Sequence, residues 1–166
     1  MKKAQSLATI QHGMIAGAAG GLAEVAWVTA YAWMTGGNPE VLARGVTTAS
    51  GVAALLPGSA TTLGVGVHMT LALMLGVALA FAWRALSNRR GVSVNPYPFM
   101  LAALTCVWAV NFFVLLPIIS PGFVHLLSYP VSLTSKLLFA LAAAEVVRRQ
   151  TVLMPGARPV PVTWRK

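Results

Sequence analysis

The chain has 166 residues, of which 57% are hydrophobic and only 9% are charged, and its formal net charge is +9. Because about a quarter of the residues in a soluble domain are charged, this composition excludes an ordinary soluble protein and predicts a protein of the lipid bilayer. A membrane-spanning helix needs about 20 mostly apolar residues. Four segments meet that need: residues 10–34, 61–83, 98–118 and 130–147. We therefore expect an all-α integral membrane protein, in which residues 1–150 form one compact bundle of four transmembrane helices.

The first predicted span, residues 10–34, carries glycines at a four-residue spacing, namely Gly13, Gly17 and Gly21. Small residues at this spacing let a neighbouring helix approach closely, which favours helix association in lipid. We expect these glycines to form a packing face. The N-terminal residues resemble a signal peptide, but the apolar stretch continues past Glu24 to Met34. That length exceeds the apolar region of a signal peptide, so we expect the helix to be retained.

Two charged residues lie well inside the apolar spans, away from their ends. Glu24 lies near the middle of the first span, and Lys136 lies inside the fourth. A charged side chain at the centre of a membrane helix costs about 2.5–3.5 kcal/mol on insertion scales, and an opposite charge offsets much of that cost. We therefore expect an intramembrane ion pair between Glu24 and Lys136. Such a pair can fix the register of two helices or belong to a proton path. Since buried ion pairs are weak evidence for function, we favour the structural role.

The segment between the first two spans predicts a short additional helix over residues 39–56. Asn38 can cap its start, with Pro39 at the first helical position and Glu40 in the first turn. Pro57 and Gly58 are typical of a helix end. Because the segment is too short to span a bilayer, we expect a surface helix in the first periplasmic loop, where it can also serve as a docking surface for another subunit.

His68 lies in a row of small residues in the second span. Gly64, His68, Ala72, Gly76 and Ala80 follow one another every four residues, which places them on one helix face. A face of small residues predicts a helix interface, so we expect His68 to be hydrogen-bonded between helices, with Gly64 and Gly76 in the packing surface.

A cofactor is the alternative role for this histidine. His68 and His125 are expected on the same, outer side of the membrane, and two histidines from different segments can hold haem b through its two axial positions. The thioethers of Met34 and Met69, expected at the same end, would suit copper instead. Methionine is common in apolar helices, and the packing role is favoured over either cofactor.

The third span contains one amide side chain, that of Asn111, which we expect to bridge two helices through hydrogen bonds. Between the third and fourth spans lie Pro117, Pro121 and Pro130. Proline interrupts helical hydrogen bonding, so this link is expected to be bent. Cys106 is the single cysteine of the chain, which excludes a disulfide framework and a cysteine-based metal motif.

Lysine and arginine are distributed unevenly over the predicted loops. Only Arg44 belongs to the outer set of loops. The inner set comprises Lys2, Lys3, Arg84, Arg89, Arg90, Arg148, Arg149, Arg158, Arg165 and Lys166. Cytoplasmic loops carry the excess of Lys and Arg, so both termini are predicted to be cytoplasmic, in the inner membrane of a bacterium. The same residues should attract anionic lipids, so the positive charge requires no nucleic acid. Residues 151–166 form a basic, proline-rich tail.

The motifs that are typical of enzymes are missing from the sequence. The chain has no aspartate, so it lacks a Ser-His-Asp set, and its glycines lie in apolar helices rather than in a phosphate-binding loop. We therefore expect no enzyme, but a non-catalytic accessory or assembly subunit of a larger membrane complex, for which a respiratory or other electron-transfer complex is the commonest setting. The alternatives are a haem b- or copper-binding electron carrier that uses His68 and His125, and a small proton-coupled transporter that uses Glu24.

Overall fold

The computed structural model describes residues 2–52, 57–90 and 95–153. In these residues every regular element is helical. The elements are α1 (Lys2–Met34), α2 (Pro39–Ala49), η1 (Pro57–Ser59), α3 (Ala60–Arg90), α4 (Pro96–Val110), η2 (Asn111–Leu115), α5 (Leu116–Ile119), α6 (Pro121–Val124) and α7 (Tyr129–Leu153). The predicted tail, apart from the last residues of α7, lies outside the described residues.

Four stretches are long and apolar enough to cross a membrane: Gln5–Met34, Ala60–Ser87, Pro96–Ile119 and Tyr129–Gln150. They coincide with the four predicted spans, extended at most ends. The prediction of an all-helical chain with four membrane-spanning helices is thereby confirmed, and it is consistent with a multi-pass membrane protein. Which ends face the cytoplasm stays a prediction.

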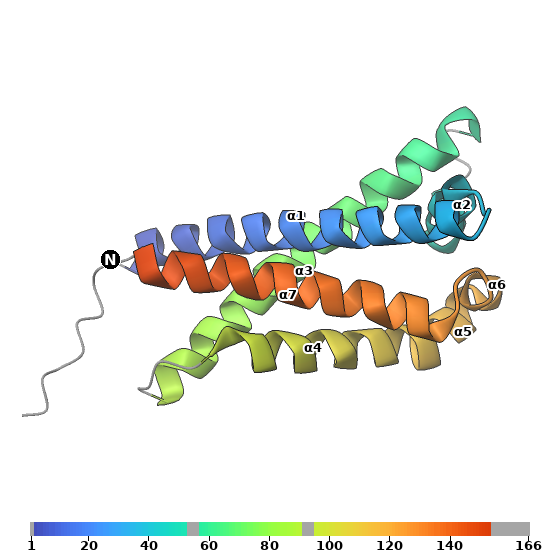
Figure 1. Cartoon of the computed structure of the whole chain (residues 1–166). Helices are drawn as coiled ribbons and strands as arrows, with labels where there is room; N and C mark the ends of the chain where they lie inside the picture. The colour runs from blue at the N-terminus through green and yellow to red at the C-terminus, as the bar shows by residue number, and fades with distance from the viewer. Residues whose placement is uncertain (1, 53–56, 91–94, 154–166) are drawn as a thin grey trace, which may run out of the picture.

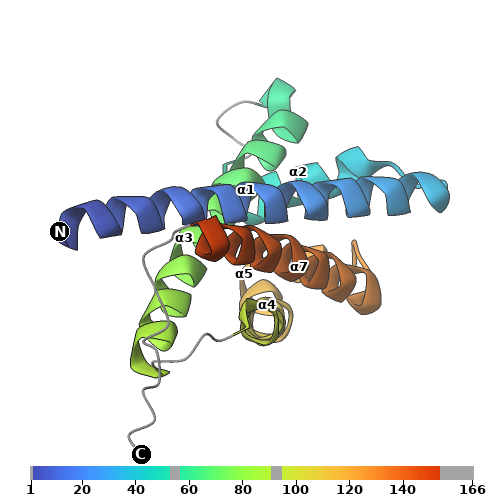
Figure 2. The ribbon, with the colours of Figure 1, turned by 60° about the vertical axis from the view of Figure 1, so that its left-hand side comes forward.

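Three long helices lie side by side and the fourth crosses them. α1, α7 and α4 run next to one another, and α3 passes obliquely across α1 (Figures 1 and 2). α3 and α4 converge near their connection, where the rings of Trp83 and Phe99 lie 5.5 Å apart, and they separate towards the end that carries α2 (Figure 1). The start of α1 and the end of α7 lie at the same end of the helix bundle (Figure 1).

The crossing of α1 and α3 depends on glycine. A Cβ added to Gly13 would lie 2.5 Å from the Cα of Val77, and one added to Gly17 would overlap the carbonyl of Ala72. From the other side, a Cβ on Gly76 would overlap the backbone of Gly13 and Gly17. The predicted small-residue faces of the first and second spans thus meet each other, backbone to backbone.

α2 starts where the sequence predicts but ends earlier. The Asn38 side chain accepts a hydrogen bond of 2.9 Å from the backbone N–H of Glu40. The helix ends at Ala49, because Gly51 adopts a left-handed conformation with φ of 73°, which glycine accommodates most readily. Of the remaining residues predicted to be helical, 53–56 lie outside the described part of the chain. α2 is packed on α3, where Thr47 is fully buried.

The third span changes its helical pitch before it ends. At Asn111 the α-helix passes into a π-helical turn, and α5 then contains Pro117. Proline cannot donate the helical backbone hydrogen bond, and π-helical turns are frequent at functional sites. The short α6 follows, so the link before α7 is bent, as the prolines predict.

The best-packed part of the interior lies among α3, α4 and α7. Met100, Leu104 and Phe139 are completely buried there. In contrast, many large apolar side chains are exposed on the outside of the helices, Leu22, Met74 and Phe113 among them. This arrangement suits a lipid environment, in which apolar side chains face the solvent that surrounds them.

Candidate functional site

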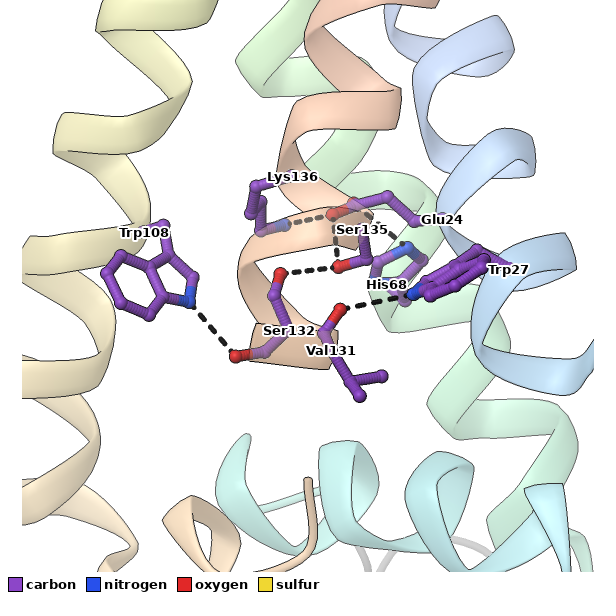
Figure 3. Close-up of polar contacts among 8 residues, drawn as sticks. All are labelled: Glu24, Trp27, His68, Trp108, Val131, Ser132, Ser135 and Lys136. Carbon is purple, nitrogen blue, oxygen red and sulfur yellow. Dashed lines mark hydrogen bonds and ion pairs between the residues drawn. The ribbon is translucent and has the colours of Figure 1, made fainter. Parts of the chain in front are cut away.

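Glu24 of α1 and Lys136 of α7 form a buried ion pair. Nζ of Lys136 lies 2.7 Å from Oε1 of Glu24, and the glutamate side chain is only 4% exposed (Figure 3). The structure therefore brings together the two charged residues that we expected to pair because both lie inside predicted membrane spans. The contact joins the first helix to the last.

Hydrogen bonds tie this ion pair into the surrounding helices. Oγ of Ser135 donates to the carbonyl of Ser132 at 2.8 Å and lies 3.3 Å from Oε1 of Glu24. Nε1 of Trp108 donates to Oγ of Ser132 at 3.0 Å, and Nε1 of Trp27 donates to the carbonyl of Val131 at 3.1 Å (Figure 3). Thus α1, α4 and α7 share one polar cluster.

The two tryptophans of this cluster were not among the residues that the sequence analysis singled out. Trp27 follows Glu24 by three residues, which places both side chains on one face of α1. That spacing is a usable pattern in the sequence. Trp108 carries no comparable pattern, because its partner lies on a different helix.

His68 of α3 faces the other oxygen of the same carboxylate. Its Nε2 lies 3.6 Å from Oε2 of Glu24, just beyond hydrogen-bond distance. Both atoms are buried and have no hydrogen-bond partner in the described structure. The ring also interacts with the backbone of Gly21 on α1. His68 therefore lies in a helix interface, as its row of small residues indicates, but its charged neighbour is Glu24.

A cavity of about 440 Å³ lies beside the cluster. Glu24, His68 and Lys136 line it, together with Asn111 at the start of η2. The rest of its wall is largely apolar and comes from all the helices from α1 to α7 and from η2. The polar cluster thus forms one side of an otherwise hydrophobic chamber.

The remaining candidate ligands do not join this site. His125 ends α6, is exposed and does not line the cavity. Met34 is exposed at the end of α1, and Met69 faces Gly21. Within the described residues, no group of three or more His, Cys, Asp or Glu side chains is placed to hold a metal ion. A haem or copper site would therefore have one half-buried histidine, His68, and lack the second.

A separate charged cluster lies at the opposite end of the long helices. Glu145 pairs with Arg148 at 2.7 Å and with Arg149 at 2.6 Å, and it accepts a hydrogen bond from the hydroxyl of Tyr97. Arg84 of α3 donates 2.7 Å hydrogen bonds to the carbonyl of Gln5 and to the hydroxyl of Thr9 on α1. Arg84 therefore joins α3 to α1 and Tyr97 joins α4 to α7, whereas Arg148 and Arg149 pair with Glu145 within α7.

Comparison with protein-family models, with curated proteins and with solved structures finds no match to this chain. The class of the protein accordingly follows from its sequence and structure alone. In the part of the chain that the structure describes, it is an all-helical protein with four helices able to cross a membrane, and a polar cluster lies beside an apolar cavity.

Proposed function

We propose that this chain is a non-catalytic membrane subunit that holds an amphipathic small molecule in the cavity between α3 and α4. The observation that carries the proposal is the composition of the cavity: a hydrophobic wall with a few titratable groups, Glu24, Lys136 and His68, gathered on one side. Binding sites for small molecules commonly have this form, with volumes of about 300–1,000 Å³. Membership of a larger complex stays a prediction.

The position of the cavity also supports a ligand that arrives from the bilayer. Four large apolar residues both line the cavity and are exposed on the outside of the chain: Val65, Leu71, Leu115 and Ile119. They lie within two helices that are able to span a membrane. An apolar chain could therefore pass between these helices without crossing water.

The test uses decanol that carries a photoreactive diazirine at the end of its chain, applied to the full chain in phosphatidylcholine nanodiscs. Val28 lines the cavity, so Val28→Trp should fill part of it and reduce labelling of the cavity peptides. Leu22→Trp places the same side chain at a position on α1 that is 61% exposed and outside the cavity. The cavity peptides of the Leu22→Trp variant should therefore be labelled to the same extent as those of the original chain. Equal labelling of all three proteins at scattered lipid-facing positions would contradict the proposal.

The second candidate is the proton-coupled transporter, and one observation favours it. Oε2 of Glu24 and Nε2 of His68 lie 3.6 Å apart without hydrogen-bond partners, so a proton held between them would give each atom a partner. Protonatable side chains inside membrane helices often belong to proton paths. In proteoliposomes with an internal pH-sensitive dye, proton uptake abolished by Glu24→Gln but retained by Glu40→Gln would support transport. Uptake no faster than in empty liposomes would contradict it.

A further inference from the structure

We propose that the molecule in the cavity has an uncharged head group that donates a hydrogen bond to Oε2 of Glu24. This inference rests on the proposed function, since it specifies the chemistry of a ligand that the cavity must first be able to bind. Its evidence is the charge balance of the polar cluster and the hydrogen-bonding capacity that the cluster leaves unused.

The charge balance favours a neutral head group. Glu24 and Lys136 are opposite charges in direct contact, so they cancel within the site. The only other titratable side chain that lines the cavity among the described residues is His68. A cationic or anionic head group would therefore add a charge without a counter-charge, and an unpaired charge is costly in a medium of low polarity.

The hydrogen bonds favour a donor. An ionised carboxylate only accepts hydrogen bonds, and Lys136 and Ser135 both approach Oε1 of Glu24. Ser135 has a single hydroxyl hydrogen, which already serves the carbonyl of Ser132 at the shorter distance of 2.8 Å. Oε2 is left as a buried acceptor with no donor. A buried acceptor without a donor is unfavourable, and a ligand that supplies the hydrogen removes that cost.

The same cluster can also serve the oxygen of the donating group. The ammonium of Lys136 has three hydrogens, and its ion pair with Glu24 uses one of them. The amide of Asn111 lines the cavity on the α4 side. A hydroxyl on an apolar chain can thus form two hydrogen bonds in this site, because it donates one to Glu24 and accepts one from Lys136. An alcohol, a phenol or the neutral glycerol head of a lipid has this chemistry.

Competition against the photoreactive decanol tests the head group directly. Four competitors share one chain: decanol, decyl methyl ether, decanoate and decylamine. The ether is uncharged and accepts hydrogen bonds but cannot donate one, so it isolates the donor from the charge. We expect decanol to compete at concentrations about tenfold lower than the ether, the size of one hydrogen bond to a charged group, and below those needed for either charged compound.

Each outcome decides between the two proposals. Equal competition by all four compounds would overturn the head-group inference while leaving the proposed function in place, because the cavity would then select the chain alone. Preference for decanoate or decylamine would overturn it in the same way, the former indicating that His68 carries a proton. If no cavity peptide is labelled by the probe, the proposed function itself fails.

A neutral double variant supplies the matched control. Glu24→Leu with Lys136→Met removes the acceptor and both charges together, so we expect labelling to persist and the preference for decanol over the ether to disappear. Glu40→Gln changes an exposed carboxylate that pairs with Arg44 on α2 and should keep the preference. A preference that survives in the double variant would overturn the inference. Should the double variant fail to fold, the competition series on the original chain still decides.

Discussion

Oε2 of Glu24 lies 3.6 Å from Nε2 of His68, and neither atom has a hydrogen-bond partner among the described residues, although the other oxygen of the same carboxylate contacts Lys136 at 2.7 Å. One carboxylate therefore has two different roles. Oε1 joins α1 to α7, whereas Oε2 and the imidazole leave unused hydrogen-bonding capacity at the wall of a cavity. Because most buried polar atoms in proteins are hydrogen-bonded, the two unpaired atoms make this cluster the best candidate for a binding site among the described residues.

The ion pair should be more sensitive to loss of one partner than to loss of both. Lys136→Met leaves the buried Glu24 without a counter-charge, and breaking a buried pair in this way costs about 3–5 kcal/mol. The double variant Glu24→Leu with Lys136→Met leaves no charge and should lose much less. Unfolding in mixed detergent micelles, followed by circular dichroism, measures both changes. Equal destabilisation by the single and the double variant would contradict a net electrostatic role.

The two glycines Gly76 and Gly66 of α3 should respond oppositely to alanine. A Cβ on Gly76 would overlap the backbone of α1, whereas one on Gly66 meets nothing within 4 Å. Gly76→Ala must separate the helices and should destabilise the protein by about 1–3 kcal/mol, the usual cost of overpacking. Gly66→Ala should stabilise α3 by about 0.5–1 kcal/mol, since alanine favours a helix. The same unfolding assay compares the stabilities of the two variants. Equal changes in the free energy of unfolding would show that α1 and α3 can move apart without loss of stability.

The excess of Lys and Arg in one set of loops predicts cytoplasmic termini. In a Cys106→Ala background, a cysteine at Ser50, beyond the end of α2, should react with a membrane-impermeant maleimide on intact cells. A cysteine at Arg158 should react only after the membrane is permeabilised. The reverse pattern would overturn the predicted orientation and would place α2 on the cytoplasmic side.

An accessory subunit should leave the membrane together with other proteins. We expect the native mass of the tagged full chain, extracted gently from its own membranes, to exceed 17.4 kDa by the mass of identifiable foreign subunits. The tag on an unrelated four-helix membrane protein controls for adventitious capture. A lone chain or a homo-oligomer would contradict the accessory role without affecting the proposed ligand site.

If the chain bound haem b or copper, the purified protein would show haem absorption or contain copper. The positions of His68 and His125 disfavour both. With His68 half-buried at the cavity and His125 exposed away from it, we expect the purified chain to show no haem absorption and no stoichiometric copper. A haem band that is lost in both His68→Ala and His125→Ala would reverse this expectation. It would require the two histidines to meet through a rearrangement of α6.

Much of the architecture follows from patterns along the chain. Apolar length determines the four spans, Asn38 and Pro39 determine the start of α2, and the spacing of Gly13 and Gly17 determines which face of α1 packs. Even the contact between Glu24 and Lys136 follows from depth, because two opposite charges at similar depth in an apolar medium have few other partners. These features are local, or depend only on position along the membrane normal, so one sequence suffices to predict them.

Only the tertiary structure decides which faces meet. The periodicity that places His68 in a packing face does not identify the opposite helix, and the oblique crossing of α3 over α1 brings it to Glu24 rather than to His125. The cavity depends on the same crossing, because α3 and α4 converge at one end and separate at the other. Crossing geometry arises from the side chains of two helices together, and no pattern within either helix alone contains it.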